Sequence, residues 1–147
     1  NIIKTLYNTV SGKTIAFLGW AFKKDTNDTR ESAAIYVADQ LMEEQATITV
    51  YDPKVKATQM QADVNNLNTR SEAENSNYLK TETDPYKALE GAHAIAVLTE
   101  WDAFKTFDWQ RIYDHMQPPA FVFDGRNVLD RGLLEQIGFV YQGVGSL

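Results

Sequence analysis

Three cationic side chains, Lys23, Lys24 and Arg30, lie in one short stretch between an apolar run and an amphipathic segment. Lysine and arginine bind phosphate and carboxylate groups through charge-assisted hydrogen bonds. When such cations follow the carboxyl end of a parallel strand and adjoin a helix N-terminus, they occupy the place where open α/β sheets bind anionic ligands. The stretch therefore predicts an anion site, and the alternative is that these cations are solvated loop charges.

The elements that would position these cations are a strand and a helix. Residues 14–18 are β-branched or apolar without alternation, which predicts a central parallel strand buried on both faces and ended by Gly19. Asp28 and Glu31 match a capping box, so we expect a helix from about Thr29 to about Glu44.

The rest of the chain continues this alternation of strands and helical segments. We expect further strands at residues 47–51, 78–82, 94–98, 120–124 and 139–142, and helices at residues 84–89, 108–116 and 129–137. The pattern predicts a Rossmann-like, doubly wound α/β fold with a mainly parallel sheet of about six strands in the order 3-2-1-4-5-6 and helices on both faces. Arg126, just past the strand at 120–124, would then lie at the same carboxyl edge as Lys23.

Asp52 ends the second strand, where an acidic residue binds a ribose in dinucleotide folds. The first loop lacks the pattern G-x-G-x-x-G, so the close approach of backbone to a pyrophosphate is not provided for. We therefore expect Asp52 to serve the turn ahead of Pro53, in a domain that is dinucleotide-like in architecture only.

Two other segments carry structural predictions. We expect the aromatic residues between positions 101 and 113 to lie in the core or at an interface between domains. Residues 69–77 lack large apolar side chains, so we expect them to form a surface excursion. A helical spacing over residues 1–10 opens without a cap, which suggests the tail of something longer.

Composition excludes several classes of function. The 147 residues carry a net charge of -6, which argues against nonspecific binding to nucleic acid or to a membrane. The sequence contains no run of transmembrane length and no signal peptide, so we expect an intracellular, cytoplasmic protein. Cysteine is absent, and the two histidines have no metal-like spacing, so we expect no metal site and no thiol chemistry in this chain.

Five motifs together resemble the C-terminal, UDP-binding domain of the UDP-glucose/GDP-mannose dehydrogenases. They are GWAFKKDTNDTRES at residues 19–32, YDP at 51–53, DPY at 84–86, TEW at 99–101 and FDGR at 123–126. Each alone is weak, but their shared order and spacing over essentially the whole chain is specific. The resemblance assigns residues 1–10 to the end of an interdomain helix or linker and residues 11–147 to the UDP-sugar-binding domain.

The resemblance implies that Phe22, Lys23 and Arg126 contact UDP-glucose, and that Arg30 approaches the phosphates of NAD. It places the catalytic groups and most of the NAD site in an N-terminal domain outside this chain, so this chain has no catalytic residue and is expected to be inactive alone. The implied whole is a homo-oligomeric enzyme that oxidises UDP-glucose to UDP-glucuronate. Two alternatives stay open: the same domain of a GDP-mannose or UDP-N-acetylhexosamine dehydrogenase, and a stand-alone nucleotide-binding regulatory module.

Overall fold

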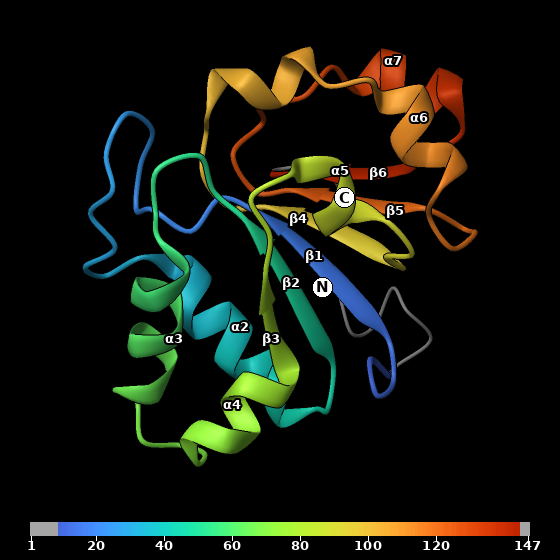
Figure 1. Cartoon of the computed structure of the whole chain (residues 1–147). Coiled ribbons are helices and arrows are strands. Elements are labelled where there is room, and N and C mark those ends of the chain that lie inside the picture. The colour runs from blue at the N-terminus through green and yellow to red at the C-terminus, as the bar shows by residue number, and fades with distance from the viewer. Residues whose placement is uncertain (1–8, 145–147) are drawn as a thin grey trace.

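The computed structural model describes residues 9–144, which form one parallel sheet with helices packed against both faces (Figure 1). The sheet has the order β3-β2-β1-β4-β5-β6, so the predicted doubly wound α/β fold is confirmed. The strands are β1 (Thr14–Leu18), β2 (Thr47–Tyr51), β3 (Leu79–Thr81), β4 (Ala94–Val97), β5 (Phe121–Asp124) and β6 (Val140–Gly143).

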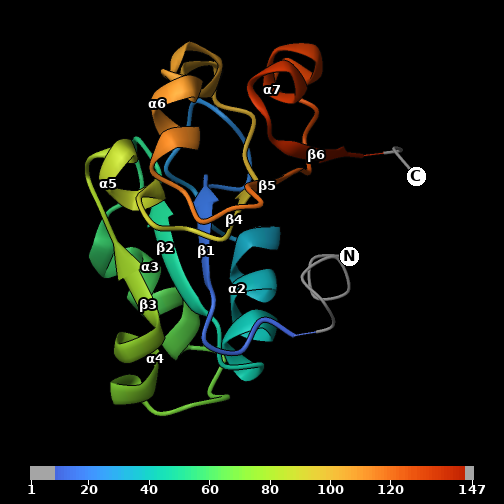
Figure 2. The ribbon, with the colours of Figure 1, turned by 90° about the vertical axis from the view of Figure 1, so that its right-hand side faces the viewer.

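Helices connect consecutive strands and divide between the two faces. Turned by 90°, the molecule shows α2 on one side of β1 and α5 and α6 on the other (Figure 2). The helices are α2 (Ala33–Glu43), α3 (Ala57–Asn65), α4 (Glu72–Tyr78), α5 (Pro85–Leu89), the 3-10 helix η1 (Asp102–Thr106), α6 (Trp109–Asp114) and α7 (Arg131–Ile137).

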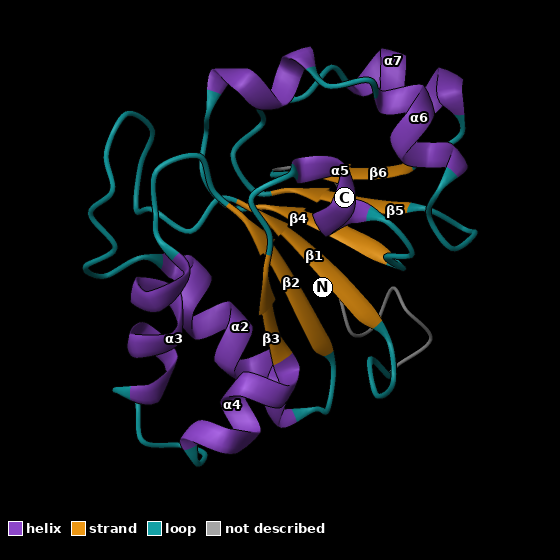
Figure 3. Cartoon of the chain, in the orientation of Figure 1, coloured by secondary structure: helices purple, strands orange, loops and turns teal. Residues whose placement is uncertain are grey.

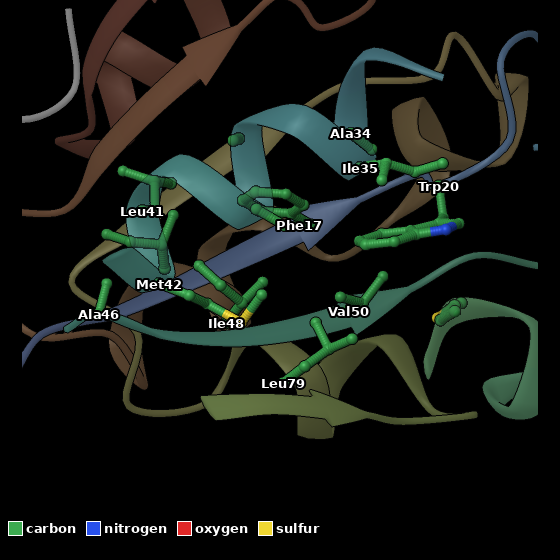
Figure 4. Packing of buried hydrophobic residues seen from close by; sticks show 14 of the residues in the cluster. Phe17, Trp20, Ala34, Ile35, Leu41, Met42, Ala46, Ile48, Val50 and Leu79 are labelled. Atoms are coloured by element: carbon green, nitrogen blue, oxygen red, sulfur yellow. The ribbon is translucent and has the colours of Figure 1, made fainter. Parts of the chain in front are cut away.

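Strand β1 separates two apolar cores. Ile15 and Phe17 point into the core beneath α2 and α3, whereas Ala16 and Leu18 point into the core beneath α5, α6 and α7. Figure 4 shows the first core, with Phe17 between the side chains of α2 and those of β2. A strand buried on both faces needs no polar alternation, which is why residues 14–18 form a continuous apolar run. The aromatic residues Trp101, Phe104 and Trp109 are buried in the second core, as predicted.

All six strands among the described residues point the same way, so the loops that follow them meet at one edge of the sheet (Figure 3). Hydrogen bonds between backbones extend the pairing beyond the strand ends: Gly19 N donates to Tyr51 O, Leu98 N to Leu18 O, and Gly125 N to Val97 O. The backbones after β1, β4 and β5 are therefore already aligned before any side chain contributes.

The predicted start of the first helix was wrong. Helix α2 begins at Ala33 and its cap is Ser32, whose hydroxyl accepts from Ala34 N at 3.2 Å. Glu31 has a positive φ of 62°, so the chain cannot be helical from Thr29 onward. Asp28 instead forms hydrogen bonds with Arg30, and the carboxylate-based capping box does not form.

Most of residues 69–77 are exposed, as predicted for a surface excursion, but Glu72–Tyr78 form helix α4. Ser71 caps it by accepting from Glu74 N, and the buried Asn75 donates to Asn65 Oδ1 of α3 and accepts from Arg70 Nε. Polar contacts hold this helix, so hydrophobic periodicity could not reveal it. The helix predicted over residues 1–10 lies mostly at residues 1–8, outside the described part of the chain.

Ser32→Ala tests the corrected start of α2. We expect a loss of about 1 to 3 kcal/mol in the free energy of unfolding, because the hydroxyl both caps the helix and donates to the buried carbonyl of Trp20 at 2.6 Å. Urea unfolding of Asp28→Ala is the comparison, and it should show the smaller change. A larger loss for Asp28→Ala would restore Asp28 as the helix cap.

Candidate functional site

The loop after β1 can follow its path only with glycine at position 19. Gly19 has a φ of +102°, and a Cβ atom there would lie 2.3 to 2.7 Å from Thr99 atoms. Any side chain would thus collide with the segment after β4. Glycine here allows the β1 loop and the β4 segment to pack in direct contact.

A buried carboxylate, Asp52, holds the start of this loop. Its Oδ2 accepts from the backbone N–H of Trp20 at 2.7 Å and of Ala21 at 3.0 Å. Its Oδ1 accepts from the backbone N–H of Lys54 and Val55 at 2.9 and 3.1 Å. The bonds from residues 54 and 55 confirm the predicted turn ahead of Pro53, but the bonds to the β1 loop were missed. An acidic residue directly after a strand was the available signal, and the sequence did not reveal which donors it serves.

Three consecutive residues after β4 each form a hydrogen bond with the β1 loop or with Asp52 at the end of β2. The buried Thr99 hydroxyl donates to Ala21 O at 2.7 Å, and Trp101 Nε1 donates to Asp52 Oδ2 at 3.2 Å. Between them, Glu100 Oε1 accepts from Lys24 N at 3.0 Å. The motif TEW at residues 99–101 is thus a set of three contacts to the carboxyl edge of β1 and β2.

Arg126, in the loop after β5, also contacts the β1 loop. Its guanidinium donates from Nη2 to Phe22 O at 2.9 Å and from Nε to Leu98 O at 3.2 Å. Nη1 lies 3.4 Å from Glu100 Oε2. Three of the five N–H groups of the arginine donate in these contacts, which leaves two for another acceptor.

The structure therefore brings together Phe22, Lys23 and Arg126, three of the four predicted site residues. Lys23 Nζ lies 5.4 Å from the centroid of the Phe22 ring, and Phe22 N donates to Asp28 O at 3.0 Å, which closes the loop. Lys23 is exposed and Phe22 is half-buried. The cluster presents one apolar ring and two cationic groups.

Lys24 is paired with acidic residues in this arrangement. Its backbone is held by Glu100, and its Nζ lies 3.5 Å from Asp102 Oδ2. Lys23 Nζ instead lies over the Phe22 ring, and its charge is near enough to Asp28 to contribute to the lowered pKa of that carboxyl group.

Arg30 stands apart from this cluster, because within residues 9–144 the hydrogen bonds of its side chain all go to Asp28. Nε donates to both carboxylate oxygens and Nη2 donates to Oδ2 at 2.7 Å. The hydrogen bonds from the Arg30 side chain lower the pKa of Asp28 to about 2. The Arg30 side chain is 87% exposed, so a phosphate could reach its guanidinium from solvent.

A second buried carboxylate, Asp124, orients the loop that carries Arg126. Its Oδ1 accepts from Arg126 N at 3.2 Å, and its Oδ2 accepts from Leu129 N at 2.7 Å and from the Tyr141 hydroxyl at 2.9 Å. Burial and this bond to Asp124 raise the pKa of Tyr141 to about 12. Asp124 was missed as a supporting residue, although like Asp52 it is an aspartate at the end of an apolar strand.

The described residues contain no cluster of three or more histidine, aspartate or glutamate side chains that could hold a metal ion. His93 accepts from Thr14 N at 3.1 Å through Nδ1, and burial together with nearby Lys13 lowers its pKa. This contact gives His93 a structural role at the start of β1. Across residues 9–144, no helix reaches the length and apolarity needed to cross a membrane.

Comparison with known proteins extends these observations. Residues 16–131 match the family model described as the UDP-glucose/GDP-mannose dehydrogenase family, UDP binding domain. The chain is 49% identical to UDP-glucose 6-dehydrogenase of Caenorhabditis elegans and 46% identical to UDP-glucose 6-dehydrogenase 5 of Oryza sativa subsp. japonica. Each alignment covers 99% of this chain, but only 30% and 32% of the respective relative.

Solved structures show the same fold. The NDP-N-acetyl-D-galactosaminuronic acid dehydrogenase of Methanosarcina mazei matches with a TM-score of 0.76 at 25% identity, over 97% of this chain and 26% of that one. The UDP-D-ManNAc dehydrogenase of Pyrococcus horikoshii matches with a TM-score of 0.70 at 26% identity, over 98% and 28%.

The motifs, the strand order and the family match all indicate the same family. The chain spans about a third of the length of the curated relatives that it matches. The chain belongs to the UDP-glucose/GDP-mannose dehydrogenase family, in which it corresponds to the UDP-binding domain.

Proposed function

We propose that this chain binds the UDP portion of UDP-glucose, within a longer protein that uses NAD to oxidise UDP-glucose to UDP-glucuronate. The observation that carries the proposal is the hydrogen bond from Arg126 to the carbonyl of Phe22, which joins two loops far apart in sequence. It places Phe22, Lys23 and Arg126 in one cluster at the carboxyl edge of the sheet, where doubly wound folds bind their ligands.

The chemistry of the cluster suits a nucleoside diphosphate. Arg126 keeps two N–H groups for phosphate oxygens, Lys23 supplies a mobile positive charge, and the Phe22 ring supplies an apolar wall. These groups bind and orient the substrate and exclude water from it, which is the positioning part of catalysis. NAD, when bound, accepts the hydrides from the sugar.

Arg30 is proposed to contact the phosphates of that NAD. Its guanidinium fits this role because it is exposed and its present acceptor, Asp28, is itself an oxyanion that a phosphate can replace. The catalytic groups and most of the NAD site belong, in this proposal, to an N-terminal domain of a homo-oligomeric, cytoplasmic enzyme. Residues 1–10 would link that domain to the UDP-binding domain, residues 11–147.

The second candidate is a dehydrogenase of the same family that acts on GDP-mannose or a UDP-N-acetylhexosamine. The two solved enzymes named above support it because both act on N-acetylhexosamine derivatives by name. UDP-glucose is favoured because the UDP-glucose 6-dehydrogenases of Caenorhabditis elegans and Oryza sativa share almost twice as much sequence identity with this chain as those two solved enzymes do. Comparing kcat/KM for the three substrates in the full-length protein would decide between them.

The 147-residue chain by itself should not oxidise UDP-glucose, because it has no cysteine nucleophile and no dinucleotide fingerprint. We expect NADH absorbance at 340 nm to stay at the level of the buffer blank. Turnover by the purified chain would contradict the proposed division between two domains and would favour a self-contained enzyme.

Lys23→Ala and Arg126→Ala should each weaken UDP binding by the full-length protein about ten- to a hundredfold, since each removes a charge-assisted contact. Arg126→Ala should have the larger effect, because it also removes the bonds to Phe22 O and Leu98 O. Arg126→Lys should recover only part of the loss, because lysine cannot reproduce the planar fork.

Calorimetric titration with UDP measures these changes, and Lys87→Ala is the matched control. Lys87 lies exposed in α5 and loses the same charge at a position outside the cluster. If either Lys23→Ala or Arg126→Ala binds UDP as tightly as the wild type, that residue is a solvated loop cation and its assignment fails.

Arg30→Ala should raise the KM for NAD more than the KM for UDP-glucose in the full-length enzyme. The physical reason is that the removed guanidinium would contact the cofactor and not the sugar nucleotide. Initial-rate kinetics at varied NAD and varied UDP-glucose measure both constants. A change limited to the melting temperature, with both constants intact, would show that Arg30 only pairs with Asp28.

A further inference from the structure

We propose that Glu100 is a positioning residue of the nucleotide site: it fastens the loop bearing Lys23 to Arg126, at the cost of placing a negative charge beside an anion site. The inference rests on the proposed function and adds a residue to it.

The carboxylate of Glu100 bridges the two loops of the cluster. Oε1 accepts from Lys24 N at 3.0 Å, in the residue directly after Lys23, and Oε2 lies 3.4 Å from Arg126 Nη1. About a third of each side chain of the Glu100–Arg126 pair is exposed. Glu100 therefore contacts both proposed ligand-binding segments and remains within reach of solvent.

The neighbours of Glu100 fix its place in the fold. Thr99 is fully buried and donates to Ala21 O, and Trp101 is buried and donates to Asp52. The backbone of Glu100 is thus held on both sides by contacts to the β1 and β2 ends. Its side chain is the part of the TEW motif that faces the cationic cluster.

A carboxylate in this place has two opposite effects on a bound pyrophosphate. Its negative charge repels the pyrophosphate, because two like charges repel each other strongly where solvent is partly excluded. Its hydrogen bond to Lys24 N and its contact with Arg126 hold the backbone next to Lys23 and the arginine side chain in place before the ligand arrives, which lowers the ordering cost of binding.

Two substitutions separate the charge from the contacts. Glu100→Gln keeps an acceptor oxygen of the same reach for Lys24 N but removes the charge, whereas Glu100→Ala removes both. If Glu100 positions the loop, the glutamine variant should bind UDP at least as tightly as the wild type. The alanine variant should bind about three- to tenfold more weakly than the glutamine variant, which has lost the same charge, and this factor is the value of one ordinary hydrogen bond.

The experiment uses the full-length protein and two measurements on each variant. Calorimetric titration with UDP gives the dissociation constant, and hydrogen exchange followed by mass spectrometry reports the protection of the Lys24 amide in peptides that span residues 20–28. We expect faster exchange of this peptide in Glu100→Ala and wild-type exchange in Glu100→Gln. Glu90→Gln and Glu90→Ala are the controls, because the exposed Glu90 precedes β4 and so lies at the opposite edge of the sheet.

Each outcome decides the matter. Equal UDP affinity of the two Glu100 variants would overturn the inference: Glu100 would be a competing charge only if both bind more tightly than the wild type, and would lie outside the site if both bind as the wild type does. Unchanged exchange in the alanine variant would also overturn the positioning role. If the wild type itself does not bind UDP, the proposed function fails together with this inference, whereas UDP binding by the wild type with equal affinities of the two Glu100 variants contradicts the inference alone.

Discussion

The carboxylate of Asp52 is the constraint on which the rest of the site depends. It accepts from the backbones of the β1 loop, from the turn after β2 and from the indole of Trp101, so one buried anion joins the ends of β1, β2 and β4. Burying a carboxylate is costly unless hydrogen bonds replace its hydration, and here five donors do so. The same bonds fix where the β1 loop leaves the sheet.

From that anchor the site is assembled mostly through main-chain groups. Thr99 binds the carbonyl of Ala21, and Arg126 binds the carbonyls of Phe22 and Leu98. A carbonyl is present whatever the side chain, so these contacts set the path of the loop while leaving Phe22 and Lys23 to serve a ligand. Asp124 does for the β5 loop what Asp52 does for the β1 loop.

The chain has a net negative charge, yet its candidate site is cationic, and nearby carboxylates pair with most of the cations there. Arg126 faces Glu100, Lys24 faces Asp102 and Arg30 faces Asp28, so each of these cations is held in the absence of ligand. These pairs are at least partly exposed, and such pairs contribute little to stability. Rearranging such a pair, as we propose for Arg30 and Asp28, would therefore cost little stability, and the charge of Lys23 would add to the attraction for an anion.

The sequence by itself determined the strands, their order and the edge at which the site lies, because continuous apolar runs such as residues 14–18 are dictated by burial on both faces of a parallel sheet. It also placed Lys23 and Arg126 at that edge, and the family resemblance added Phe22. Only the tertiary structure decided that Ser32 and not Asp28 caps α2, that α4 is a helix, and that Asp52, Glu100 and Asp124 hold the loops. Hydrophobic periodicity indicates which side chains are buried away from water. A polar side chain, in contrast, can bind many different partners, and only the folded chain brings a particular donor within hydrogen-bonding distance.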